Sequence, residues 1–184
     1  MTATGLDWRL DEREVAIERP HPLSRRLLGG ALAGLVATLP MTLAMAALHR
    51  RLPPRERHPL PPRHITEKLV EESGLAPKLS EPEMRTLTFA AHFAYGAAAG
   101  AAYGLLASLL RGPSVLGGVI FGLGVWAGSY AGWLPAANVL PSAGHESARR
   151  NALMIAAHVV WGAATGALAR LASGPRARAV RHET

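Results

Sequence analysis

The chain contains no cysteine, so disulfides, iron–sulfur clusters and thiolate chemistry are excluded. Charge is also scarce: charged residues make up 18% of its 184 residues, against about 25% in a typical soluble domain. No Asp, Glu, Lys or Arg lies in residues 27–48, 86–110 or 151–169, and Glu146 is the only one in residues 112–148. Such long uncharged segments are typical of helices that cross a bilayer.

Motifs that would mark an enzyme are missing as well. The sequence has no Gly-rich phosphate loop, no nucleophile elbow, no H-E-x-x-H and no paired carboxylates within its apolar segments. Its net charge of +7 would suit nucleic acid, but the arginines flank the apolar segments, where anionic lipid headgroups attract them equally well. We therefore predict a non-enzymatic protein that meets the lipid bilayer and not nucleic acid.

The uncharged segments predict an all-α membrane protein, a bundle of four transmembrane helices. The expected spans are residues 27–48, 87–110, 114–134 and 151–171 of a membrane domain at 27–172, between a polar tail at 1–26 and a basic tail at 173–184. As a helix, the first span would be about 33 Å long, against a hydrocarbon core of about 30 Å. It is expected to be a retained anchor, because no signal-peptide pattern precedes it.

Residues 49–86 are expected to form a proline-rich loop between the first two spans. The prolines at 53–54 and within 59–62 favour extended polyproline II geometry. Residues 64–73 then predict a short amphipathic helix that ends at Gly74. Ser80 and Glu83 have the spacing of a capping box, so the second long helix is expected to begin near Glu81, outside the bilayer.

Charge counts do not orient the chain in the membrane. The segments expected on the two sides of the membrane each carry ten Lys and Arg residues. The positive-inside rule therefore assigns no orientation. The basic C-terminal tail favours cytoplasmic termini.

Two segments, 90–101 and 156–167, repeat at a constant offset of 66 residues. The alignment places His158 on His92 and keeps an aromatic residue and two glycines in register. Because one span lies between them, both segments should cross the membrane in the same direction, as copies of a two-helix unit.

Every expected span also carries glycines four residues apart, which share one helix face. They are Gly30 and Gly34; Gly96, Gly100 and Gly104; Gly118 and Gly122; Gly124, Gly128 and Gly132; and Gly162 and Gly166. Lipid gives helices little hydrophobic gain on association, so such stripes predict close backbone packing. The packing partner is either a neighbouring helix or another subunit, which makes a homo-oligomer or a membrane-protein partner an expectation.

Polar groups at membrane depth are costly and usually have a purpose. His92 and His158 are the foremost, and helical spacing indicates that Arg150, Asn151 and His158 line one polar groove. In the first span Pro40 cannot donate to the carbonyl of residue 36, so we expect a kink there. Hydroxyls flank that weak point and aromatic donors lie in the other spans: Thr38 and Thr42; Tyr95, Trp126, Tyr130, Trp133 and Trp161.

Three interpretations of the two histidines stay open. Each imidazole could only hydrogen-bond a neighbouring helix, or the pair could respond to pH within a small transporter or channel subunit. The third is bis-histidine ligation of haem or a metal, with no other metal site expected. Before the last span, His145, Glu146, Arg149 and Arg150 form a charged cluster, interpreted as a helix start in contact with headgroups.

Several segments carry a family resemblance. Residues 30–49, which include the Ala-Thr-Leu-Pro-Met-Thr run, the proline-rich 53–57 and 59–63, and residues 149–154 ahead of His158 resemble the YagU-like proteins. These are uncharacterised multi-pass proteins of the bacterial inner membrane that have been linked to acid resistance. The resemblance implies that location and a stress- or pH-linked role through His92 and His158. It supplies no catalytic or ligand residues.

Overall fold

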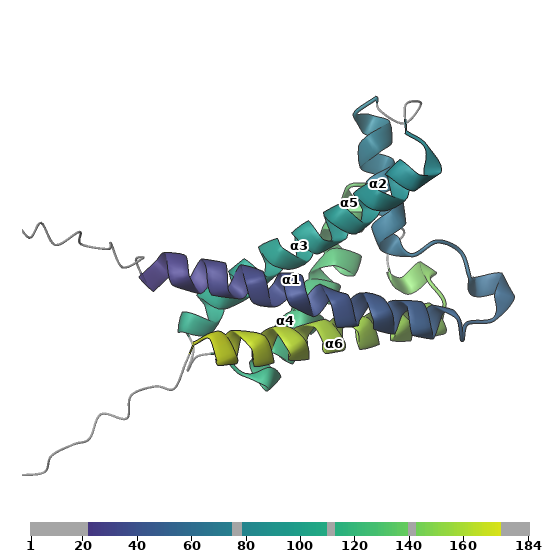
Figure 1. Ribbon diagram of the computed structural model, residues 1–184. Helices are drawn as coiled ribbons and strands as arrows, with labels where there is room; N and C mark the ends of the chain where they lie inside the picture. The colour runs from purple at the N-terminus through teal and green to yellow at the C-terminus, as the bar shows by residue number, and fades with distance from the viewer. Residues whose placement is uncertain (1–21, 75–78, 110–112, 140–142, 174–184) are drawn as a thin grey trace, which may run out of the picture.

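In the computed structural model, residues 22–74, 79–109, 113–139 and 143–173 are described, and they contain helices and no strand. The prediction of an all-helical protein is confirmed. Most of the two expected tails lies outside these residues. The helices are α1 (Pro22–His49), η1 (Pro54–Glu56), α2 (Pro61–Glu72), α3 (Glu81–Leu109), α4 (Val115–Gly128), the π-helix η3 (Ser129–Trp133), α5 (Leu134–Ala136), η4 (Ala143–His145) and α6 (Ala148–Ala172), as Figure 1 shows.

Three helical runs among the described residues are long and apolar enough to cross a membrane: Leu23–His49, Val115–Ala136 and Ala148–Ala172. They indicate a membrane protein. The helix at the second expected span, α3, is not among the three, although it has 29 residues. Its uncharged part is diluted by histidine, tyrosine and glycine, which lower its mean hydropathy.

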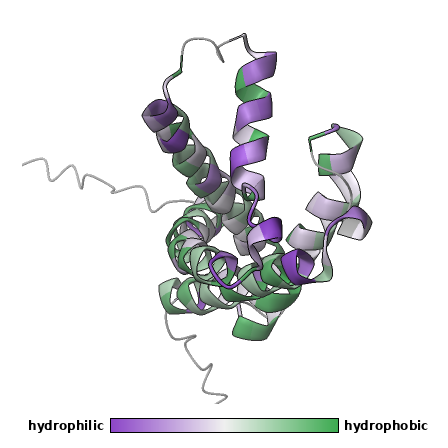
Figure 2. Cartoon of the chain, turned by 90° about the vertical axis from the view of Figure 1, so that its right-hand side faces the viewer, coloured by the Kyte–Doolittle hydropathy of each residue, from purple (hydrophilic) through white to green (hydrophobic). Residues whose placement is uncertain are grey.

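The long helices are arranged in the order α3, α1, α6, α4. The helix α1 packs on both α3 and α6, and α4 packs on α6, whereas α3 and α4 barely touch. The N-terminal half of α3 diverges from α1 and is accompanied by α2 (Figure 1). Polar residues gather on α2 and the adjoining end of α3, which project from the apolar bundle (Figure 2). The arrangement therefore places α3 and α4 at its two ends, where side chains such as Tyr103 and Phe121 bridge them.

The α1–α3 and α4–α6 pairs meet at glycines. A Cβ on Gly34 would lie 2.2 Å from the carbonyl oxygen of Gly96, and one on Gly100 would lie 2.3 Å from that of Gly30. In the second pair, a Cβ on Gly166 would lie 2.2 Å from the carbonyl oxygen of Ser114. No real Cβ comes so close, so only a hydrogen atom fits at these positions. Gly124, Gly128 and Gly132 have no neighbouring atom within 4 Å of such a Cβ and lie at no crossing.

The two crossings follow one pattern, which bears on the internal repeat. Gly96 and Gly100 face α1 as Gly162 and Gly166 face α4. In both pairs, contacts move back along one helix as they move forward along the other, so the pairs are antiparallel. Because α1 is also antiparallel to α6, α3 and α6 run in the same direction, as the 66-residue offset implies.

Proline positions correct two expectations. Pro61 and Pro62, interpreted as polyproline II, instead form the first turn of α2, where a missing N–H costs nothing. Pro135, expected to end the third span, lies inside α5, and the helical run continues to Ala136. Gly74 follows α2 with a φ of 71°, as a glycine at a helix C-terminus commonly does.

Capping residues set two helix starts. Ahead of α3, both the N–H and the hydroxyl of Ser80 donate to the Glu83 carboxylate, at 2.8 and 2.6 Å. This is the reach-back half of a capping box. The helix α6 begins three residues before the expected span, because the Ser147 hydroxyl accepts from the N–H of Arg150 at 3.3 Å.

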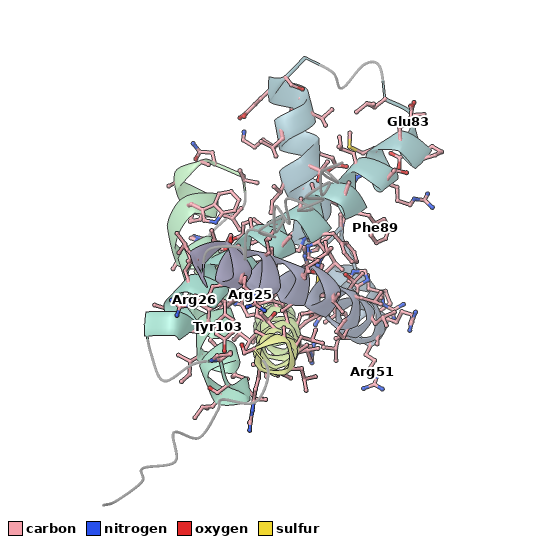
Figure 3. All side chains as sticks on the ribbon, turned by 60° about the vertical axis from the view of Figure 1, so that its left-hand side comes forward. Arg25, Arg26, Arg51, Glu83, Phe89 and Tyr103 are labelled. Atoms are coloured by element: carbon pink, nitrogen blue, oxygen red, sulfur yellow. The ribbon has the colours of Figure 1, made fainter. Side chains whose placement is uncertain are left out.

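The ends of α1 carry basic residues at opposite ends of the bundle. Arg25 and Arg26 lie near the start of α1, at the end of the bundle where the Arg26 carbonyl meets Gly104 of α3, and Arg51, two residues after α1, lies at the other end (Figure 3). The Tyr103 hydroxyl donates to the carbonyl of Ser114 at 2.9 Å, which ties α3 to the start of α4. Glu83 lies at the projecting end of α3, far from Tyr103 (Figure 3).

Candidate functional site

A cavity of about 240 Å³ lies where α3 diverges from the bundle. Its walls come from α1, α2, α3, the end of α4, η3 and α6. The volume is slightly below the roughly 300–1,000 Å³ of pockets for drug-sized ligands. Most of the lining is apolar, including Met41, Met45 and Met154, with a few polar groups. This combination is typical of a site for a small ligand.

Both histidines of the repeat line this cavity, His92 from α3 and His158 from α6. The Nδ1 of His158 lies 2.8 Å from the carbonyl oxygen of Met154. A carbonyl only accepts, so Nδ1 carries the proton and Nε2 of the neutral ring is left as an acceptor. The Nε2 of His92 is buried and has no hydrogen-bond partner.

The π-helix η3 supplies the polar groups opposite the histidines. It forms because the N–H of Leu134 donates to the carbonyl of Ser129, five residues back, just before Pro135, which has no N–H. The wide turn places Ser129 and Tyr130 on the cavity. Tyr130 is only 5% exposed, and its hydroxyl has no partner. A buried hydroxyl without a partner is costly.

The cavity opens beside exposed aromatic and aliphatic side chains. Tyr95 is 46% exposed, Trp133 is 43% exposed and Leu69 of α2 is 57% exposed, and all three line the cavity. The rings of Tyr95 and Trp133 lie 6.4 Å apart. The hydroxyl of Ser129 accepts from the Trp133 indole at 3.3 Å and lies 3.3 Å from the Tyr95 hydroxyl. Tyr95 belongs to α3, and Trp133 belongs to η3, which continues α4.

The predicted hydroxyls of α1 serve the backbone. Thr38 lines the cavity and donates to the carbonyl of Gly34 at 2.8 Å, and Thr42 donates to that of Thr38 at 2.7 Å. The indole of Trp161 donates to the Gly34 carbonyl as well, at 3.1 Å, which joins α6 to α1. The helix α1 continues through Pro40.

Arg150 does not join the groove expected with His158. It is 5% exposed, and its guanidinium donates to the carbonyls of Glu56, His58 and Pro59 at 3.0, 3.1 and 3.1 Å. Its Nε donates to Glu146 at 3.0 Å. The interpretation of this residue as a headgroup contact is therefore wrong: Arg150 holds the proline-rich loop on α6. Asn151 is not among the residues that line the cavity.

Glu56 completes this junction from the loop. Its carboxylate accepts from the Ser147 hydroxyl at 2.7 Å and from Arg149 at 3.1 Å. The Ser147 hydrogen bond and the Arg149 guanidinium hold the pKa of Glu56 below its usual value. The carboxylate also lies at the N-terminus of α6, where the helix dipole favours a negative charge.

Some site residues escaped the sequence reasoning. Glu56 and Ser147 are about ninety residues apart, and nothing in their local patterns links them. The available signal was the unusual concentration of charge in Glu146, Arg149 and Arg150, which needed a partner of opposite sign. Among the described residues, no group of three or more His, Cys, Asp or Glu side chains could hold a metal ion.

Comparisons with known proteins give one match. No curated protein and no solved structure matches the chain. Residues 41–166 match the model of a family described as a protein of unknown function, DUF1440. The matched range includes both histidines, the loop junction and all four glycines of the α4–α6 crossing, but only the α3 side of the α1–α3 crossing. This chain therefore belongs to the DUF1440 family, whose members have no established function.

Proposed function

We propose that this protein is a non-enzymatic, four-span protein of the bacterial inner membrane that binds a small, mostly apolar molecule in the cavity. The observation that carries the proposal is the meeting of His92, His158 and Tyr130 around one cavity. Two of these side chains present buried polar atoms without a partner. Native proteins rarely leave such atoms unpaired, so a bound molecule is the expected partner.

The glycine crossings support a fourth span. The helix α3 meets α1 through Gly96 and Gly100 with backbone contact, as α6 meets α4. Close contact of this kind is the means by which helices associate in lipid. With α3 as a span, the chain crosses the bilayer an even number of times. Arg25, Arg26 and Arg51 would then lie at headgroup level, where anionic lipids attract them.

Topology reporters test the span count. Fusions of alkaline phosphatase and of green fluorescent protein after Leu48, Leu110 and Leu134 report the side of the membrane at each point. Four spans require Leu48 and Leu110 on opposite sides and Leu110 and Leu134 on opposite sides. If Leu48 and Leu110 are on the same side, α3 does not cross.

A pH-linked role follows from the same cavity. The described residues that line it include no carboxylate, so a protonated imidazole would bring an uncompensated charge to apolar walls. A neutral ligand is then expected to bind less tightly in acid. Acid survival of cells that carry His92→Gln or His158→Gln, at equal expression, tests whether this linkage has a physiological role.

Binding itself is tested with the purified protein and a neutral fluorescent probe, N-phenyl-1-naphthylamine. Ala91 lines the cavity, whereas Ala98 on the same helix is exposed. We expect Ala91→Leu to fill the cavity and abolish the increase in probe fluorescence, and Ala98→Leu to leave it unchanged. Equal probe binding in both variants would overturn the proposal.

The absorbance spectrum of the same sample tests the bis-histidine haem alternative, which requires a Soret band. Flux of the probe or of protons in proteoliposomes would favour the transporter alternative.

A further inference from the structure

We propose that the cavity binds the ring of a lipid-soluble quinone or hydroquinone, with the isoprenoid or alkyl tail leaving through the opening beside Tyr95 and Trp133. The inference rests on the proposed function and names its ligand class. Four properties of the site lead to it: the absence of charge, the hydrogen-bonding groups, the flat aromatic walls and the position of the opening.

The ligand should be neutral. The described residues that line the cavity include no Asp, Glu, Lys or Arg. A charged ligand would lose its hydration there without meeting a counter-ion, which is strongly unfavourable. Lipid phosphates, fatty-acid carboxylates and nucleotides are therefore poor candidates.

The ligand should also carry oxygen atoms that both accept and donate. The Tyr130 hydroxyl is buried without a partner and can donate to a carbonyl oxygen. The Nε2 of His158 is an acceptor, because its Nδ1 donates to Met154, and it suits a ligand hydroxyl. The Nε2 of His92 has no partner and can serve in either role, according to its tautomer. A pure hydrocarbon would satisfy none of these three groups. A quinone offers two acceptors, and a hydroquinone offers two groups that donate and accept.

The walls favour a flat ring. Four aromatic side chains line the cavity, Tyr95, Tyr130, Trp133 and Trp161. Aromatic rings pair with other rings in offset or edge-on arrangements, with a gain beyond the area that they bury. Methionines, whose sulfur atoms contact aromatic ring edges favourably, fill the remaining wall. A volume of about 240 Å³ accommodates one small ring.

The opening favours a molecule that arrives from the bilayer. It is bordered by exposed Tyr95, Trp133 and Leu69, which are aromatic or aliphatic. It lies between α3, which carries Tyr95, and η3, which carries Trp133. The charged junction of Arg150 and Glu56 lies at the start of α6, and neither residue lines the cavity. An apolar tail can thus remain in lipid while the ring enters.

Decylubiquinone is the probe for the test, added to the full-length protein in detergent. Binding is followed by quenching of tryptophan fluorescence and by displacement of N-phenyl-1-naphthylamine. Decylbenzene, which has the same tail without the oxygens, serves as the matched ligand. We expect decylubiquinone to displace the naphthylamine at a concentration at least about tenfold lower than decylbenzene requires, because only the quinone satisfies the buried polar groups.

Tyr130→Phe removes the hydroxyl and keeps the ring. It should weaken decylubiquinone binding about 3- to 10-fold, the loss expected for one neutral hydrogen bond, and leave naphthylamine binding unchanged. Tyr103→Phe is the control, because Tyr103 is equally buried but its hydroxyl already donates to Ser114.

If decylubiquinone and decylbenzene bind equally, or Tyr130→Phe binds the quinone as tightly as the parent, the ligand class is wrong. Naphthylamine binding that still depends on Ala91 would then leave the proposed function standing. If naphthylamine also fails to bind, both proposals fall.

Discussion

The guanidinium of Arg150 donates to the backbone carbonyl of Pro59, 91 positions earlier in the chain, at 3.1 Å. The same guanidinium binds two more loop carbonyls and Glu146. Because α2 begins at Pro61, only two residues after this contact, the junction fixes the start of a helix that forms one wall of the cavity. A charged residue at the start of α6 thus helps to position one wall of the uncharged cavity.

Replacing Arg150 with lysine is expected to release the proline-rich loop. Lysine keeps the charge, but it is a point donor and cannot reach four acceptors spread around a planar fork. Loop carbonyls that lose this partner make the docked loop less favourable. We expect cleavage by trypsin after Arg55 to accelerate about tenfold or more, equivalent to about 1.4 kcal/mol of lost docking free energy. Arg149→Lys is the matched control, because the Arg149 side chain is 63% exposed. Equal acceleration in both variants would contradict the role given to Arg150.

The same junction should depend on pH through Glu56. Its pKa in the folded protein lies below the usual value, because the Ser147 hydroxyl and the Arg149 guanidinium bind the ionised carboxylate. Because the folded-state pKa is lowered, the ionised Glu56 carboxylate stabilises the docked loop at neutral pH. The contribution is lost as the pH falls below the ordinary glutamate value of about 4.3 and through the folded-state value. Loop docking is thus expected to weaken in acid.

Hydrogen–deuterium exchange measures this effect directly. Protection of residues 52–60, corrected for intrinsic exchange rates, should fall between pH 6 and pH 3.5 in the parent protein. Glu56→Gln should show low protection at both pH values. Glu81→Gln is the control, because Glu81 pairs with Arg63 in the first turn of α2 and not with Ser147 or Arg149. A loop whose protection is the same at both pH values in the parent protein would show that Glu56 does not hold it.

Tyr103 gives a further prediction, at the opposite end of the bundle. Its hydroxyl donates to the Ser114 carbonyl at 2.9 Å and accepts from the Ser114 N–H at 3.1 Å. Tyr103→Phe leaves both backbone groups without that partner, which should cost about 1–3 kcal/mol. A lower thermal midpoint in detergent, with unchanged helix content by circular dichroism, is the expected result. Tyr95→Phe should have less effect, because the Tyr95 hydroxyl makes only a long contact to Ser129 and the residue is exposed. A larger loss at Tyr95 would contradict this ranking.

The parts of this fold that depend on local sequence patterns could be predicted from the sequence. Uncharged segments predicted helices, and the offset between His92 and His158 predicted that α3 and α6 run in the same direction. Contacts between distant segments were out of reach. Nothing near Glu56 in the chain indicates Ser147 or Arg149 as partners. The wide turn that brings Tyr130 to the cavity depends on one shifted backbone hydrogen bond, which periodicity does not record. The prolines at 61 and 62 were misplaced because proline suits both an extended segment and a first helical turn.

The glycine crossings allow the sharpest test of how the bundle is held together. A methyl group on Gly100 would lie 2.3 Å from the Gly30 carbonyl oxygen and 2.6 Å from the Cα of Gly34. Both neighbours are backbone atoms, so α1 and α3 must move apart to admit it, and overpacking of this kind typically costs about 1–3 kcal/mol. Gly29→Ala is the matched control, since a Cβ there meets nothing within 4 Å and alanine favours the helix by roughly 1 kcal/mol. We expect Gly100→Ala to lower the thermal midpoint in detergent and Gly29→Ala to leave it unchanged or raise it. Because α3 also carries His92, separation of the two helices should weaken naphthylamine binding in Gly100→Ala alone. If both variants have the same thermal midpoint, the contact between α1 and α3 leaves room for a methyl group at Gly100.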